Sequence, residues 1–376
     1  MGVDINKKVV DDLNEGEIHI FEKGIKESLR KSIDIGKFKA NCEPGFSDVF
    51  IIAVPTPFKE CKPEAIPEPD LEYVFSAISS CIPFLKPSNL IIIESTCPVG
   101  TTDRIKNFLI SKNIDIDKIH LAYCPERVLP GNIMKELVYN DRVIGGIDKD
   151  SSLEAFKFYK TFCKGYLEIS NAKTAEMVKL VENSYRDINL AFANQISIIC
   201  DKESINVYDL ISISNKHPRV DILKPGCGVG GHCIAVDPWF LIDKYKEDSS
   251  LLYKARQVNE NKTYWVINKI KEREKIIRRY LGRDPTIACM GATFKANVDD
   301  IRNSPSLTII KELIKSQINV ITCDPYVNKL ENIRFFSIED IVNEADIFVL
   351  LVAHDKFKHL DFREKEILDF CGLMQN

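Results

Sequence analysis

The segment "HCIAVDP" places a thiol, Cys233, four residues before a carboxylate, Asp237. If the segment forms a turn of helix, this spacing puts both side chains on the same face. A thiol at a helix N-terminus has a lowered pKa, and a carboxylate beside it can move a proton or orient a water. The spacing suggests covalent catalysis on sulfur, with a buried, inert cysteine as the alternative.

Lys179 and Asn183 have the same spacing in "AEMVKLVENSYRD". A cation beside an amide donor could stabilise an alkoxide or the oxyanion of a covalent intermediate. The same pair on an exposed helix face would be solvated, so spacing alone leaves both interpretations open.

Three glycines, Gly226, Gly228 and Gly231, form a G-x-G-x-x-G pattern in "LKPGCGVGGHCIAVDPWF". A dinucleotide fingerprint needs a strand before it and a helix after it. Here a proline-punctuated loop precedes the glycines and a cysteine follows them. We expect them to leave room and backbone N–H groups for a substrate beside Cys233 rather than to hold a pyrophosphate.

These residues must be positioned by the surrounding α/β structure. Short apolar runs between helix-length stretches predict buried parallel strands covered on both faces. The runs are residues 47–55, 89–96 and 118–125, and again 286–294, 318–325 and 345–357. Between the two groups, residues 174–201 contain no Pro or Gly and predict one long helix. Because its apolar residues lie on more than one face, we expect a helical dimer core, and thus a homodimer or higher homo-oligomer.

The two groups of strands resemble each other, since "SDVFIIAVPTPF" is close to "ADIFVLLVAHDKF" and "GVDINKK" to "TCDPYVNK". In this correspondence Asp4 and Asp324 each follow a second strand, where a dinucleotide-binding fold has its ribose-binding carboxylate. The strand, glycine turn and helix that would precede Asp4 have no counterpart, so we expect the first domain to lack them. The alternative is a likeness that any two α/β sheets share.

Composition narrows the classes of partner. A net charge of −4 leaves no basic surplus for phosphates, so we expect no nucleic-acid partner. No apolar run reaches the roughly 18 residues of a membrane span, and the N-terminus does not read as a signal peptide. The twelve cysteines are scattered without any C-x-x-C, which fits neither a zinc site nor a disulfide scaffold. We expect a soluble cytoplasmic protein that acts on a small molecule, without a metal or a membrane.

The chain resembles the UDP-glucose/GDP-mannose dehydrogenase family, which oxidises the C6 alcohol of a nucleotide sugar to a carboxylate. The resemblance runs from residue 1 to about 373 and rests on "VPTPF", "ESTCPVGTT", "AYCPERVLPG", "RVIGGI", "AEMVKLVENSYRDINLAFANQ", "HPRVDILKPGCGVGGHCIAVDPWF" and "GATFKANVDDIRNSPS". It implies an α/β fold with two Rossmann-like doubly wound domains, joined by a long central helix and a helical dimerisation domain. The expected domains are residues 1–168 for NAD, 169–272 for dimerisation and the catalytic Cys, and 273–376 for the UDP-sugar.

The resemblance also implies a four-electron oxidation in two hydride steps, with NAD as the cofactor. In that scheme Cys233 holds the aldehyde as a thiohemiacetal and then as a thioester, which splits one difficult oxidation into two transfers. Lys179 and Asn183 would stabilise the oxyanion, Lys179 would also transfer a proton, and Asp237 and Glu126 would assist the water.

Binding residues follow from the same resemblance. The substrate-binding positions would be Arg127, Val128, Lys179, Asn183, Arg186, His217, Arg219, Gly230, Phe294 and Lys295. In the family, the loop that corresponds to His217 and Arg219 reaches the site from a partner subunit. The NAD-binding positions would be Asp4, Thr56, Thr96 and Arg302.

Two departures from the family pattern bear on function. Cys227 replaces the usual proline of the glycine segment, residues 226–231. Pro130 stands where the UDP-glucose branch has a second glutamate, and this second departure favours a UDP-N-acetylhexosamine substrate. Because the phosphate-binding turn has no counterpart, a catalytically silent nucleotide-sugar-binding protein is the competing interpretation. A 2-hydroxy-acid or phosphogluconate-type dehydrogenase is a third, disfavoured by Cys233 and the second α/β domain.

Overall fold

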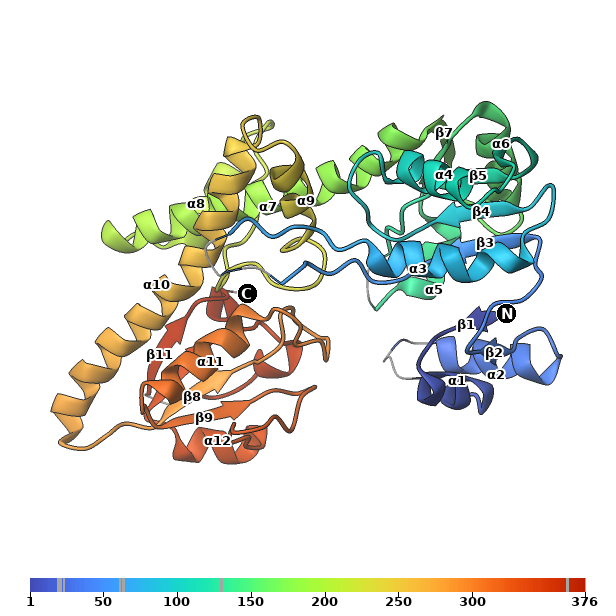
Figure 1. Ribbon diagram of the computed structural model, residues 1–376. Helices are drawn as coiled ribbons and strands as arrows, with labels where there is room; N and C mark the ends of the chain where they lie inside the picture. Colours follow the sequence, from blue (N-terminus) through green and yellow to red (C-terminus); the bar gives the residue numbers. More distant parts are fainter. Residues whose placement is uncertain are drawn as a thin grey trace. The chain divides into compact units, whose positions relative to one another are not determined.

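The computed structural model describes residues 1–18, 22, 24–60, 62, 65–128, 131–362 and 365–375; Pro130 lies outside them. The chain forms two compact units (Figure 1). The first unit comprises Met1–Glu182 and Trp239–Lys244, and the second comprises Asn183–Pro238 and Tyr245–Asn376. None of the described helices is both long and apolar enough to cross a membrane.

The first unit begins with the strand and helix predicted around Asp4. Strand β1 (Gly2–Val3) pairs in parallel with β2 (Ala40–Asn41) in a small sheet of its own. Helix α1 (Lys7–Asn14) starts after Asn6, whose side chain accepts the Lys8 N–H and caps the helix. Helix α2 (Ile25–Asp34) follows. Asp4 therefore lies between a strand end and a helix start, as predicted.

The larger sheet of this unit contains the three predicted strands. Its order is β3 (Val49–Ile52), β4 (Leu90–Ile93), β5 (His120–Tyr123), β6 (Arg142–Gly146) and β7 (Leu167–Asn171). The first three are parallel to one another, as expected. Strand β6 is antiparallel to β5, a reversal that the predicted strand and helix alternation did not include.

Helices cover both faces of this sheet. Alternate strand residues point to opposite sides and therefore pack against different helices. Ile91 and Ile93 pack with α3 (Glu72–Cys81) and α4 (Thr101–Ser111), whereas Ile92 packs with α6 (Lys149–Lys160). Helix α5 (Ile133–Tyr139) precedes β6. Four short 3₁₀ segments complete the described structure: Ile82–Phe84, Ile116–Lys118, Asp355–Phe357 and Leu373–Gln375.

The predicted long helix is confirmed as α7 (Ala172–Lys202), which runs from the first unit into the second. The second unit continues with α8 (Val207–Ser214) and α10 (Ser250–Leu281), while α9 (Asp237–Lys244) returns the chain to the first. Two buried contacts join α10 to α7: Arg256 donates to Asp187 Oδ1 at 2.7 Å and Asn259 donates to the same oxygen at 2.8 Å. These two helices cross within the second unit (Figure 1).

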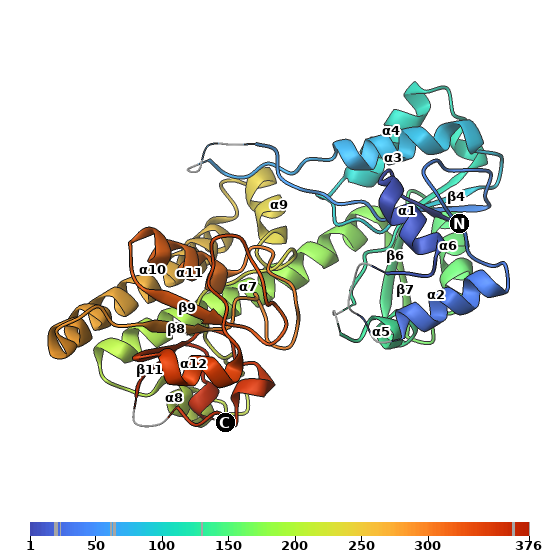
Figure 2. The ribbon, with the colours of Figure 1, turned by 90° about the horizontal axis from the view of Figure 1, so that it is seen from below.

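The second unit ends in a four-stranded parallel sheet, with the order β11 (Glu366–Asp369), β10 (Ile347–Leu350), β8 (Ile287–Met290) and β9 (Val320–Cys323). Helices α10 and α11 (Pro305–Lys315) pack on one face and α12 (Ile338–Glu344) on the other. Figure 2 shows α11 and α12 on opposite sides of the strands. The fold is α/β with Rossmann-like sheets in both units, as predicted.

Candidate active site

A buried amide and carboxylate form the centre of the candidate site in the second unit. Asn183 Nδ2 donates to Asp237 Oδ2 at 2.5 Å, and the two residues are only 8% and 2% exposed. The Asp237 N–H donates to the Cys233 carbonyl at 2.8 Å, which closes one helical turn. The predicted common turn of Cys233 and Asp237 is confirmed. However, α9 begins at Asp237, so the half-buried Cys233 precedes the helix rather than starting it.

Lys179 and Glu126 meet in the first unit. Lys179 Nζ donates to the Glu126 carbonyl at 2.7 Å. The Glu126 carboxylate bends back on its own loop, where Oε1 accepts the N–H groups of Arg127 and Val128 at 2.5 and 2.8 Å. Three predicted site residues thus share the segment that Lys179 holds, and one oxygen of Glu126 is occupied by backbone.

Two charged residues near Glu126 were missed by sequence reasoning. Glu182 accepts two hydrogen bonds from Arg127, at 2.5 and 3.1 Å. The buried Arg142 guanidinium has Nη2 3.8 Å from Glu126 Oε2 and lies 4.9 Å from the ring centroid of Tyr159. The only signal for Arg142 was a charge at the start of the apolar "RVIGGI". Glu182 gave none, since a charge on a helix is usually solvated.

The glycine segment packs tightly against Phe294. A Cβ on Gly230 would lie 2.4 Å from the Asn303 carbonyl and 3.0 Å from Phe294 Cβ. Gly231 has φ +86°, and its Cβ would lie 2.9 Å from the Phe294 ring. Only glycine fits this close approach. The described residues between α8 and this segment contain no strand, so the segment does not have the strand-to-helix context of a dinucleotide fingerprint.

Arg302, predicted for NAD, is held by Asp300. Its Nη2 lies 2.6 Å from Asp300 Oδ2, and its carbonyl accepts the Gly231 N–H at 3.1 Å. Burial would raise the pKa of Asp300, but the hydrogen bonds from Arg302 lower it below its ordinary value. Lys295 lies in the same loop and is exposed. The structure therefore brings Gly230, Phe294, Lys295 and Arg302 into one loop region of the second unit.

The other predicted NAD residues lie in the first unit. Thr56 follows β3 and Thr96 follows β4, so both come after the carboxyl ends of neighbouring parallel strands. Their loops are joined by the Ser95 hydroxyl, which donates to the Val54 carbonyl at 2.7 Å. Asp4 is exposed after β1, and its Oδ1 accepts the Asn6 N–H at 2.8 Å.

Three predicted substrate residues lie on the surface. Arg186 is exposed on α7, and His217 and Arg219 are exposed in the segment after α8. That segment is closed by Asn215, whose amide exchanges hydrogen bonds of 2.7 and 3.0 Å with the backbone of Ile222. Arg186 lies on α7 about one turn after Asn183, whereas His217 and Arg219 come from a separate segment of the chain.

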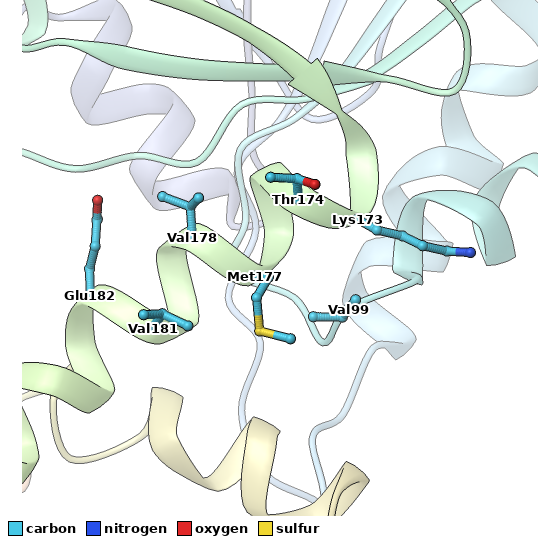
Figure 3. A pocket seen from close by; sticks show the side chains of 7 residues that line it. All are labelled: Val99, Lys173, Thr174, Met177, Val178, Val181 and Glu182. Carbon is cyan, nitrogen blue, oxygen red and sulfur yellow. The ribbon is translucent and has the colours of Figure 1, made fainter.

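A cavity of about 430 Å³ lies along the N-terminal half of α7 in the first unit (Figure 3). It is lined by Val99, Lys173, Thr174, Met177, Val178, Val181 and Glu182. The lining is mostly apolar and does not include Lys179, so this cavity is not where the predicted catalytic groups gather. Among the residues that the structure describes, no cluster of three or more His, Cys, Asp or Glu could hold a metal ion.

Three models of one family match the chain in order. The NAD binding domain of the UDP-glucose/GDP-mannose dehydrogenase family matches residues 1–163, its central domain 173–261 and its UDP binding domain 288–374. Relatives include a UDP-N-acetyl-D-mannosamine dehydrogenase of Methanocaldococcus jannaschii, 46% identical over 100% of this chain and 84% of the relative. An NDP-N-acetyl-D-galactosaminuronic acid dehydrogenase of Ralstonia solanacearum is 42% identical over 99% of this chain and 90% of the relative.

A solved structure agrees with these matches. The UDP-D-ManNAc dehydrogenase of Pyrococcus horikoshii superposes with a TM-score of 0.90 at 37% identity, over 99% of this chain and 89% of the other. The order of domains and the fold therefore agree, and this chain belongs to the UDP-glucose/GDP-mannose dehydrogenase family of enzymes.

Proposed function

We propose that this protein oxidises the C6 alcohol of a UDP-N-acetylhexosamine to the uronate with NAD⁺. UDP-N-acetyl-D-mannosamine is the substrate that we propose first. The observation that carries the proposal is the buried hydrogen bond between Asn183 and Asp237, one turn from Cys233. A buried carboxylate bonded to an amide beside a thiol is suited to acyl chemistry on sulfur. Relatives with UDP-N-acetyl-D-mannosamine in their names support the choice of substrate.

In the proposed mechanism Cys233 is the nucleophile. After the alcohol has become an aldehyde, the Cys233 thiolate adds to its carbon and gives a thiohemiacetal. Loss of a second hydride gives a thioester, and attack by water breaks the C–S bond, releasing the carboxylate and the thiol. NAD⁺, when bound, accepts the hydrides, one for each of two molecules.

Lys179, Asn183, Asp237 and Glu126 are proposed to serve this chemistry. Lys179, as the neutral amine, would take the proton of the alcohol in the first step. The ammonium formed in this way and the Asn183 amide would then donate to the oxyanion of the thiohemiacetal. Asp237, which is tied to Asn183, would accept a proton from the attacking water. Glu126 keeps Oε2 directed toward Arg142 and is proposed to help orient that water.

The substrate would be held by the predicted set of residues. Phe294 lies against the glycine segment at Gly230. This position supports a role for the loop that carries Phe294 in stacking on the base or in contacting the sugar of the substrate. We propose that UDP and the sugar contact Arg127, Val128, Lys179, Asn183, Arg186, His217, Arg219, Gly230, Phe294 and Lys295.

NAD fits the chemistry of its proposed donors. The exposed carboxylate of Asp4, after a strand and before a helix, suits a ribose hydroxyl. The hydroxyls of Thr56 and Thr96 follow adjacent strands, and Arg302 supplies a cation. We also propose that residues 1–168 bind the cofactor, residues 169–272 form the dimer and carry Cys233, and residues 273–376 bind the UDP-sugar. A cytoplasmic location also belongs to it, because the described cysteines are thiols, as in a reducing compartment.

We propose a homodimer formed through α7. Tyr185, Phe192 and Ile199 recur every seven residues on this helix and are 68%, 50% and 48% exposed. Such a stripe suits a second copy of the same helix. Phe192→Glu is expected to shift sedimentation from dimer to monomer, with Tyr280→Glu, at an exposed site near the end of α10, as the control. A monomeric wild-type chain would contradict the dimer.

The test of the activity uses purified chain, NAD⁺ and the D-manno, D-gluco and D-galacto epimers of UDP-N-acetylhexosamine. Two NADH per uronate are expected, with the D-manno epimer preferred. Cys233→Ala should bind UDP-sugar as the wild type does and form no acid, whereas Cys42→Ala, at an exposed thiol, should be fully active. Acid formation by Cys233→Ala would refute the thioester mechanism.

A further inference from the structure

The C-terminal sheet reverses its strand order between β8 and β10, which are adjacent although β9 lies between them in sequence. In doubly wound sheets a ligand binds beyond the carboxyl ends of the strands at such a reversal. Residues 291–303 follow β8 there and include Phe294 and Lys295, while residues 351–357 follow β10. His354 lies in the second of these segments and is fully buried.

His354 is bonded to Asp324, which occupies the tip of β9. The Asp324 carboxylate has no exposed surface, and His354 Nε2 lies 3.2 Å from its Oδ2. The Asp324 carboxylate also accepts four backbone N–H groups at 2.7 to 3.3 Å, those of Ala292, Thr293, Tyr326 and Val327. A carboxylate has about four acceptor positions, so Asp324 has none to spare for a ribose hydroxyl.

The internal repeat equates Asp324 with Asp4, yet the two carboxylates are used differently. Asp4 is exposed and accepts the Asn6 N–H of its own turn. Asp324 faces inward, where it organises the ends of β8, β9 and β10. In this sheet, therefore, the residues that can meet a nucleotide belong to the loop after β8 and not to the strand-tip carboxylate.

The hydrogen bonds define the tautomer of His354. Its Nδ1 accepts the Asn297 N–H at 3.0 Å, so the proton of the neutral ring is on Nε2. This N–H faces both Asp324 Oδ2 and Thr293 Oγ1, each at 3.2 Å. Thr293 and Asp324 therefore address the same nitrogen. That excludes a hydroxyl, imidazole and carboxylate relay, which needs the two ring nitrogens to face different partners.

The same bonds reach the loop that carries Phe294 and Lys295. The Thr293 hydroxyl donates to the Lys295 carbonyl at 2.9 Å. Asn297 has φ +62°, which is uncommon for a residue other than glycine. Its side-chain amide exchanges hydrogen bonds of 2.6 and 3.0 Å with Asp355. Both ends of residues 293–297 are thus fixed to His354 or to its neighbour, while Lys295 between them stays exposed.

We infer that His354 is a positioning residue for nucleotide binding: through Asn297 and Thr293 it holds residues 293–297 in the one conformation that presents Phe294 and Lys295 to the UDP moiety. The inference rests on the proposed function, since it takes UDP as the ligand of this loop. Removing the imidazole would leave the Asn297 N–H without its acceptor and Asp324 without one of its donors.

The experiment measures UDP binding by calorimetry to the full chain and to three variants. His354→Ala is expected to weaken UDP binding by at least about tenfold, because a loop displaced by about 1 Å presents its contacts poorly. His354→Asn keeps an acceptor near the position of Nδ1, and His354→Gln keeps a donor near that of Nε2. At least the Asn variant should recover part of the affinity. The KM for UDP-sugar should rise while the KM for NAD⁺ stays at its wild-type value.

Ile321→Ala is the matched control, because Ile321 is fully buried in β9 and packs on the α12 face of the same sheet. It should lower the Tm without changing the affinity for UDP. Unchanged UDP binding by His354→Ala would overturn the inference, and so would an equal loss of binding in Ile321→Ala at the same loss of Tm. If His354→Ala does not fold, the Asn and Gln variants decide, since wild-type UDP affinity in both would overturn it. A wild-type chain that binds UDP but forms no acid would refute the proposed function and leave this inference standing.

Discussion

The side-chain amide of Asn183 and the carboxylate of Asp237 are joined by a buried hydrogen bond of 2.5 Å. The bond connects α7 to the first residue of α9 across 54 positions of sequence. Because an amide N–H donates to it, the carboxylate is fixed in orientation, which is what a proton acceptor in catalysis requires. Asp237 also ends the turn that starts at Cys233, because its N–H donates to the Cys233 carbonyl.

Asp237→Asn tests the chemical role of that carboxylate. The amide keeps the shape and can still bond to Asn183, but it cannot accept a proton. We expect kcat to fall by about 10²- to 10⁴-fold, the usual contribution of a general base, with little change in Tm. Steady-state rates measure this, with Asp243→Asn on the same helix as the control. A kcat within a few-fold of wild type would assign Asp237 a purely structural role.

Glu176→Gln tests a buried helix cap. Glu176 lies on α7 and is fully buried, and its carboxylate accepts the N–H of Gly100 and both the N–H and the hydroxyl of Thr102 at the start of α4. Glutamine would turn an NH₂ toward one of these donors. We expect the free energy of unfolding to fall by about 1 to 3 kcal/mol in urea denaturation. Glu203→Gln, at an exposed position, should cost nothing measurable.

Lys262→Met tests the cost of a buried cation. Lys262 is 3% exposed, donates to Ser197 Oγ at 2.7 Å and lies 3.8 Å from the centre of the Trp265 ring. Burial lowers the pKa of Lys262 to about 8, against roughly 10.4 in an unfolded chain. Between these values the unfolded state binds more protons, so Lys262 makes stability rise with pH from about 8 to 10.4, by about 3 kcal/mol at most.

At pH 7 the folded state bears the full penalty of charging Lys262, so the Met variant should be more stable there. Its advantage should disappear above about pH 10. Urea denaturation between pH 7 and 10.5 measures the difference, and Lys275→Met, at an exposed position of the same helix, should not change the slope. A variant that is less stable than wild type at pH 7 would mean that the bond to Ser197 and the contact with Trp265 outweigh the burial cost.

A pair of glycine substitutions tests the packing of the glycine segment on Phe294. Gly231 and Gly282 both have positive φ, +86° and +67°, so alanine is strained at each. A Cβ at Gly282 would meet open space, but at Gly231 it would meet the Phe294 ring at 2.9 Å. Gly282→Ala should cost about 1 kcal/mol, as a glycine C-cap does. Gly231→Ala should cost more and also weaken UDP-sugar binding. If both variants show the same change in Tm and the same change in the KM for UDP-sugar, this account is contradicted.

Local pattern predicted most of the fold. Each apolar run contained one strand, because a strand buried on both faces must be apolar throughout. The long helix appeared where no Pro or Gly interrupts residues 172–202. The antiparallel pairing of β6 with β5 was missed, because direction depends on how the chain turns between strands and not on the strand's composition.

The candidate site was predictable only where its residues are close in sequence. Cys233 and Asp237 share a turn, so spacing alone joined them. Glu182 and His354 were missed because their partners are 55 and 30 or more positions away, and a charged or polar residue gives no local sign of being paired. The repeat that equated Asp4 with Asp324 gave the right position in the fold but the wrong environment, since it contains no information about His354.

Burial divides the thiols of this chain into two chemical classes. Eight of the eleven described cysteines are buried, and burial raises the pKa of several, among them Cys97, Cys124 and Cys289. Cys42 is exposed, and Cys233 and Cys371 are half-buried. Electrophiles react with accessible thiolates, so selectivity toward them is set by the sheets and not by the number of cysteines. Among its described residues, a cysteine-rich chain therefore offers an oxidant or an alkylating drug very few targets, and the proposed nucleophile is one of them.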